Sequence, residues 1–168
     1  MSDYWKQHYD EAVLRNPSSP FKQIGKTIKG VEIQTSQIDL IVAHIAESLA
    51  LTKKDRLVDL GCGNGVLTVR LAKKISSVVG IDFTRGLLEY AENNFSAHNI
   101  TYLFSNITEL DCVSWIDATK LCMFEVLQHL NEIEFSRLLA NLANLPSGVL
   151  FFIGGVPDKQ RLRNFYDT

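Results

Sequence analysis

The sequence predicts an α/β domain with a doubly wound, mostly parallel sheet, and three observations support this. Short apolar segments that suit buried strands alternate with segments whose apolar residues recur at helical spacing. A glycine-rich turn at 61–65 joins the first of these strands to the helix after it. The chain has 168 residues and is 46% hydrophobic, which suffices for one buried core. We therefore expect three layers, with helices on both faces of the sheet.

Residues 1–34 precede the predicted sheet and are expected to form a separate arm. A short helix, a loop rich in proline and serine, and an irregular segment with lysines and glycines follow one another here. The aromatic residues of this arm either form a lid over a ligand or pack as a first helix on the sheet. They are Tyr4, Trp5, Tyr9 and Phe21.

The first core helix is predicted from Ser36, which with Asp39 is typical of a helix start, to Leu51. Thr84 is expected to cap a later helix, and Asn131 with Glu134 to open another through a capping box. Helical spacing also begins at 66, directly after the glycine turn. The buried strands are predicted at 56–60, 77–82, 100–104, 119–124 and 149–153.

Two aspartates stand at the ends of the first two strands, where sheets of this kind bind ligands. Asp59 comes two residues before Gly61, and a carboxylate there would repel a pyrophosphate but attract a cationic group. Val66 occupies the position at which the dinucleotide-binding motif requires its third glycine. Asp82 could accept both ribose hydroxyls of an adenosine group, or it could cap the helix that begins near Thr84.

The segment 59–65 resembles the D-x-G-x-G-x-G motif of the class I S-adenosylmethionine (SAM)-dependent methyltransferases. The resemblance covers roughly residues 35–155 and implies a Rossmann-like core, placed here at 35–168, that binds SAM as its cofactor. It implies methyl transfer to an oxygen, nitrogen or carbon nucleophile of a small molecule. The cofactor-binding residues that it implies in the first two loops are Asp59, Gly61, Cys62, Gly63, Asn64, Gly65, Asp82 and Phe83. Phe83 would lie against the adenine, although a simply packed aromatic is an alternative.

Two later loops extend the resemblance. Ser105, Asn106 and Ile107 follow the third strand, where the family commonly has an aspartate that accepts the adenine amino group. The amide oxygen of Asn106 can still accept that bond, but without the charge. The stretch 123–130 resembles an E-V-x-x-H segment of small-molecule methyltransferases.

The resemblance at 123–130 assigns three roles. It implies that Phe124 flanks the methionine part of the cofactor. It also implies that Glu125 and His129 face the acceptor as candidate catalytic residues. In the alternative interpretation, His129 only caps or packs the loop before the next helix.

Composition disfavours several other classes of protein. A net charge of −2 offers no general attraction to nucleic acid or to an anionic membrane. The three cysteines lack metal-ligand spacing, so we expect no metal site and reduced thiols in a cytoplasmic protein. No signal peptide or membrane-spanning run is predicted. Two alternatives to the enzyme stay open, namely a non-catalytic SAM-binding module or regulatory subunit, and a nicotinamide-dependent oxidoreductase.

The family's sheet closes with an antiparallel hairpin after the fifth strand, whereas residues 154–168 offer no further apolar strand. The fifth strand would then be a bare apolar edge, which folded proteins normally cover. We therefore expect either that the core is the N-terminal part of a longer protein, or that a second chain, such as a homodimer partner, covers this edge.

Overall fold

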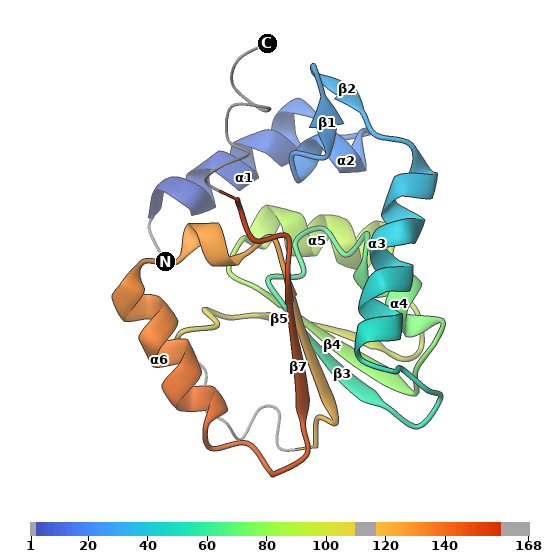
Figure 1. Ribbon diagram of the computed structural model, residues 1–168. Coiled ribbons are helices and arrows are strands. Elements are labelled where there is room, and N and C mark those ends of the chain that lie inside the picture. Colours follow the sequence, from blue (N-terminus) through green and yellow to red (C-terminus); the bar gives the residue numbers. More distant parts are fainter. Residues whose placement is uncertain (1–2, 110–116, 159–168) are drawn as a thin grey trace.

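Five parallel strands form the central sheet of the computed structural model, which describes residues 3–109 and 117–158 (Figure 1). The order is β5-β4-β3-β6-β7, so the chain builds outward from β3 on one side and then returns to its other side. This arrangement confirms the predicted doubly wound α/β fold. The strands are β3 (Arg56–Leu60), β4 (Ser77–Asp82), β5 (Ile100–Phe104), β6 (Lys120–Phe124) and β7 (Leu150–Gly154).

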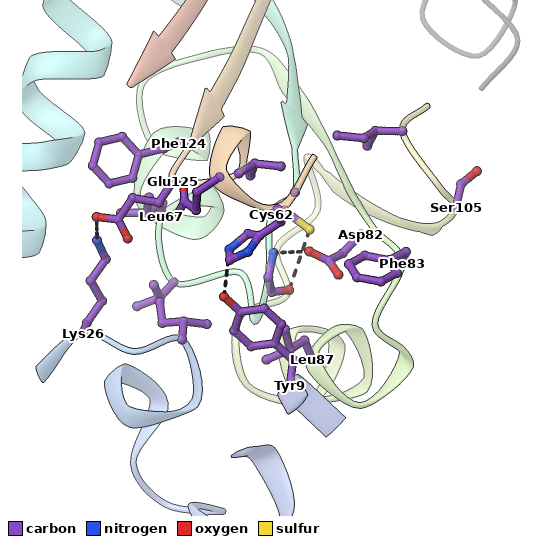
Figure 2. A pocket seen from close by; sticks show the side chains of 18 residues that line it. Tyr9, Lys26, Cys62, Leu67, Asp82, Phe83, Leu87, Ser105, Phe124 and Glu125 are labelled. Atoms are coloured by element: carbon purple, nitrogen blue, oxygen red, sulfur yellow. Dashed lines mark hydrogen bonds and ion pairs between the residues drawn. The ribbon is translucent and has the colours of Figure 1, made fainter. Parts of the chain in front are cut away.

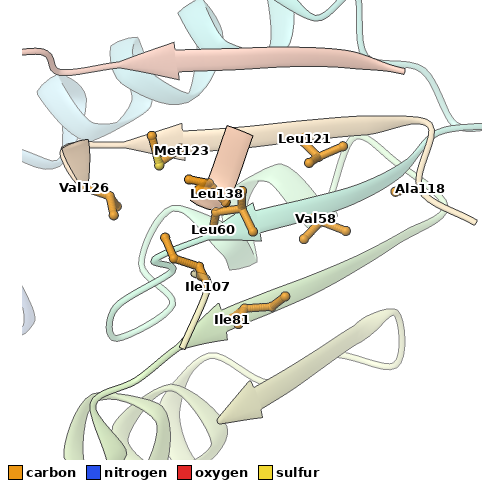
Figure 3. Packing of buried hydrophobic residues seen from close by; sticks show 9 residues of the cluster. All are labelled: Val58, Leu60, Ile81, Ile107, Ala118, Leu121, Met123, Val126 and Leu138. Carbon is orange, nitrogen blue, oxygen red and sulfur yellow. The ribbon is translucent and has the colours of Figure 1, made fainter. Parts of the chain in front are cut away.

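Helices cover both faces of this sheet, because successive strand residues point to opposite sides. Val58 and Leu60 pack with Leu138 of α6 (Glu132–Leu142) on one face, and Figure 3 shows this cluster. Leu57 packs on the other face against α3 (Thr35–Ser48) and α4 (Thr68–Ala72). A further helix, α5 (Arg85–Asn94), packs on β4 and β5. The predicted three layers are therefore present.

The helix starts differ in part from their predicted positions. Gln34, and not Ser36, caps α3, because its side chain and that of Gln37 form a capping box. The helix α4 begins at Thr68 rather than at 66, because the glycine turn continues for two more residues. The predicted capping box of Asn131 and Glu134 at α6 is confirmed.

The N-terminal arm is more regular than the sequence suggested. It consists of α1 (Asp3–Arg15), α2 (Pro20–Gln23) and a small hairpin of β1 (Thr27–Ile28) and β2 (Val31–Glu32). Lys29 and Gly30 both have positive φ, as a two-residue hairpin turn requires. One carboxylate oxygen of Glu32 accepts hydrogen bonds from two backbone N–H groups at the start of α2, and thereby fastens the hairpin to that helix. The irregular segment predicted here is thus an ordered unit.

The arm lies beyond one end of the sheet (Figure 1). Its Lys26 pairs with Glu125, which directly follows β6, so this is the carboxyl end of the strands. At the side of the sheet, β7 pairs only with β6 among the described residues. The cover expected for this edge stays a prediction. Within the described ranges, no helix has the length and apolar character needed to cross a membrane.

Candidate functional site

A cavity opens at the carboxyl ends of the strands, between the sheet and the arm (Figure 2). Loops that are far apart in sequence meet there, as expected where the strand order reverses between β3 and β6. Arm residues such as Tyr9 and Lys26 line it together with these loops. The sequence-predicted residues among its lining are Gly61, Cys62, Gly63, Asp82, Phe83, Ser105, Ile107, Phe124, Glu125 and His129.

The glycine turn needs its glycines for different reasons. Gly61, Gly63 and Gly65 all have a positive φ, which residues other than glycine rarely adopt. A Cβ added to Gly61 would come within 2.3 Å of the Val126 side chain, and one added to Gly65 within 2.4 Å of the Tyr102 hydroxyl. At Gly61 and Gly65, packing as well as backbone conformation therefore requires glycine.

Gly63 is in a different environment. A Cβ there would meet only Ile24 of the arm, at 3.4 Å, and this glycine borders the cavity. Its backbone is thus open to a ligand.

The carboxylate of Asp82 fastens this turn to the start of α5. One oxygen accepts a hydrogen bond from the Gly63 N–H at 2.9 Å, and the other accepts from the Thr84 N–H at 2.8 Å. Burial raises the pKa of Asp82, and the backbone hydrogen bonds oppose that rise. The capping alternative is therefore present, and the same carboxylate also borders the cavity.

Asp59 lies beneath the turn and does not line the cavity. Its carboxylate accepts hydrogen bonds from the Thr68 hydroxyl at 2.6 Å and from the Cys122 thiol at 3.3 Å. Burial raises the pKa of Asp59 despite these bonds. The side chain thus points toward α4. The expected direct contact of Asp59 with a cationic ligand stays a prediction.

Three other predicted residues, among them Gly65, also stand outside the lining. Asn64 is fully buried and donates to the Pro20 carbonyl and to the Gln23 side chain, each at 2.8 Å, so it holds the arm. The amide oxygen of Asn106 accepts from the N–H and the hydroxyl of Thr108, which closes a local turn. The predicted adenine contact of Asn106 would have to compete with this turn.

His129 faces the cavity from η2 (Leu127–His129) and contacts the arm. Its Nε2 lies 3.1 Å from the Tyr9 hydroxyl oxygen. Its ring packs edge-on against Trp5, with 4.2 Å between the ring centroids. Burial, and then nearby His8, lower the pKa of His129. Burial raises the pKa of Tyr9 to about 12, with Asp82 and Glu125 adding to the rise. At neutral pH the pair is therefore an uncharged imidazole beside a protonated phenol.

An ion pair closes the other side of the cavity. Lys26 Nζ lies 2.5 Å from a carboxylate oxygen of Glu125 and 4.8 Å from the centre of the Phe124 ring. Sequence reasoning missed Lys26, because nothing in a lysine among glycines indicates a partner 99 residues away. Tyr9 and Ile24 also line the cavity from the arm, so α1 acts as cover as well as packing on α5. Among the described residues, no cluster of potential metal ligands is found.

Comparisons with known proteins identify a family. The family model described as "Methyltransferase domain" matches residues 57–146. The chain is 32% identical over 111 residues to ribosomal RNA small subunit methyltransferase A of Shouchella clausii, which is 65% of this chain and 38% of the relative. It is 30% identical over 120 residues to ubiquinone biosynthesis O-methyltransferase of Coxiella burnetii, which is 65% of this chain and 47% of the relative. The chain thus spans less than half the length of these relatives.

Solved structures show the same fold. The SAM-dependent methyltransferase from Anabaena variabilis superposes with a TM-score of 0.67 over 89% of this chain and 60% of its own, at 19% identity. At this identity the likeness concerns the fold alone.

The glycine geometry predicts that two alanine substitutions differ in effect. Both Gly61→Ala and Gly63→Ala should lose roughly 1–2 kcal/mol to the positive φ, but only the former places its methyl group against Val126. We therefore expect the free energy of unfolding, measured in urea, to fall further for Gly61→Ala. Equal losses would show that the Val126 contact relaxes without cost.

Asp59 predicts a pH dependence of stability. Because its pKa is raised in the folded state, the folded protein holds this proton more tightly than the unfolded chain. The carboxyl group therefore stabilises the fold most at low pH, and this stabilisation is lost as pH rises from the unfolded toward the folded pKa. The unfolding free energy of Asp59→Asn minus that of wild type should be larger at about pH 7 than at about pH 4. A difference that shrinks with rising pH would contradict the assignment.

Proposed function

The chain belongs to the class I SAM-dependent methyltransferases, and from this premise we propose that it transfers a methyl group from SAM to an oxygen, nitrogen or carbon nucleophile of a small molecule. One observation carries the proposal: Asp82 and the open glycine Gly63 are hydrogen-bonded to each other at the edge of one cavity. A carboxylate beside an uncovered stretch of backbone is what an adenosine group requires.

The residues around the cavity fit the cofactor in charge as well as in shape. The carboxylate of Asp82 borders the cavity and favours a sulfonium cation, whereas that of Glu125 is paired with Lys26 and that of Asp59 lies beneath the turn. The raised pKa of Tyr9 has burial as its main cause, and the charges of Asp82 and Glu125 contribute to it. Gly61, Cys62 and Gly63 would contact the cofactor from the turn, and Phe83, Ser105 and Ile107 would surround its adenine.

SAM supplies a methyl group that its positive sulfur already activates, so the protein's task is alignment and handling of one proton. We assign the proton to His129. Its pKa is lowered by burial, so the imidazole is neutral and can accept the proton that the acceptor loses when it is methylated. Tyr9 would hold the ring through its hydroxyl.

The acceptor that we propose is a small molecule. A small molecule is favoured by the net charge of −2 and by the partly enclosed cavity under the arm. A ribosomal RNA acceptor is the second candidate, because one relative is named as a ribosomal RNA methyltransferase. Incubation with methyl-labelled SAM and separate pools of metabolites and ribosomal RNA tests both. Labelling of the RNA alone would contradict the small-molecule assignment, and labelling of neither would favour a non-catalytic SAM-binding module.

Asp82→Ala should weaken the binding of SAM and S-adenosylhomocysteine alike. Each lost hydrogen bond to a charged oxygen costs about 1.5–3 kcal/mol, and the Gly63 backbone loses its anchor as well. Titration calorimetry measures the effect, and exposed Asp39→Ala serves as the control. Unchanged affinity in a folded Asp82→Ala protein would contradict the ribose role.

His129→Ala should lower turnover more than SAM affinity, once an acceptor is known. A general base contributes roughly 10²- to 10⁴-fold to rate, whereas the cofactor would contact mainly Gly63 and Asp82. Initial rates and calorimetry on the same preparation separate the two effects. Equal losses in both, or none in either, would return His129 to a packing role.

A further inference from the structure

The ion pair of Lys26 and Glu125 stands at the opposite side of the cavity from Asp82 and Phe83 (Figure 2). It is the feature of the site that the proposed methyl transfer leaves unexplained. Among the described residues that line the cavity, Lys26 is the only lysine or arginine, and the acidic residues there are Asp82 and Glu125. A pocket that had only to attract a sulfonium would gain nothing from a cation.

Both charges are placed at a cost. The Lys26 side chain is only 10% exposed and lies over the Phe124 ring, and a covered ammonium is costly without a partner. Glu125 has a φ of +57°, a conformation that non-glycine residues rarely adopt. Its N–H is held by the Gly154 carbonyl at 2.9 Å, so the end of β7 maintains this strained backbone. Backbone strain of this kind is found at binding sites.

We propose that Lys26 and Glu125 recognise the charged amino-acid end of the cofactor, the lysine its carboxylate and the glutamate its ammonium group. The inference rests on the proposed function, and it moves Glu125 from the acceptor side to the cofactor. The two opposite charges match the ammonium and carboxylate that an α-amino acid carries on one carbon. In the ligand-free protein the two side chains neutralise each other, and on binding each exchanges its partner for the matching group of the ligand.

The location supports this assignment. With the adenosine placed at Asp82 and Phe83, the rest of the cofactor would extend past Gly63 toward Phe124, the residue next to Glu125, and all of these residues line the cavity. Lys26 reaches the same point from the arm, so the arm contributes a ligand contact as well as a cover. The Glu125 carboxylate is 40% exposed, which leaves an oxygen available for a second partner.

A comparison of two ligands tests whether Lys26 and Glu125 bind the amino-acid end of the cofactor. S-adenosylhomocysteine carries the amino-acid end, whereas 5′-methylthioadenosine retains the adenosine and the sulfur but lacks that end. In calorimetry we expect Lys26→Met and Glu125→Gln each to weaken the binding of S-adenosylhomocysteine roughly ten- to a hundredfold. The affinity for 5′-methylthioadenosine should change by less than about threefold. Binding of this ligand also shows that the variants fold. The control variant Lys22→Met alters a lysine of the arm outside the cavity, and it should leave the affinity for both ligands unchanged.

A charge-exchanged double variant, Lys26→Glu with Glu125→Lys, tests the main alternative. It preserves an ion pair between the arm and β6 but reverses the polarity presented to a ligand, so S-adenosylhomocysteine binding should stay weak. Restored binding, or equal losses for both ligands in the single variants, would show that the pair only holds the arm in place. Unchanged S-adenosylhomocysteine affinity in the single variants would overturn the inference alone. A wild-type protein that binds neither ligand would overturn the proposed function and the inference together.

Discussion

The carboxylate of Asp82 is the interaction on which the geometry of the site depends. It joins the backbone of the glycine turn to that of the start of α5, two segments that no continuous hydrogen-bond ladder connects. The Gly61 and Cys62 N–H groups both donate to the Ile81 carbonyl just before it, so the turn is fixed to the end of β4 at adjacent points. A ligand at this edge therefore meets a backbone that is already in position, which reduces the entropy lost on binding.

Sequence reasoning was most accurate where local patterns and burial agree. The bounds of β3, β4 and β5 match their predicted ranges, because continuous apolar residues between turn signals are typical of strands covered on both faces. It was less accurate for α3 and α4, whose starts depend on a glutamine cap and on the length of the glycine turn. The hairpin of the arm was missed, since strands of two residues leave no periodicity to read.

The candidate site shows the same division. The cavity gathers ten of the predicted residues, because parallel strands bring their following loops to one edge. Asn64 and Asn106 were expected beside the ligand but make their hydrogen bonds to the arm and to a local turn. A side-chain amide can serve either purpose, and only the three-dimensional partners decide between them. Lys26 was missed for a related reason, since its partner Glu125 is distant in sequence.

The arm is joined to the core by polar and by apolar contacts. Asp10 accepts from the Gly86 N–H, Asn64 donates to the α2 segment, and Lys26 pairs with Glu125. The apolar contacts are those of Phe21 and Ile24, which pack with Ile38 and Val66 of the core, and that of Trp5 with the His129 ring. The element that covers the cavity is therefore part of a hydrophobic cluster of the core, so lifting it away would expose apolar surface to water. A ligand held beneath the arm would thus be shielded from solvent by a cover that is packed in place.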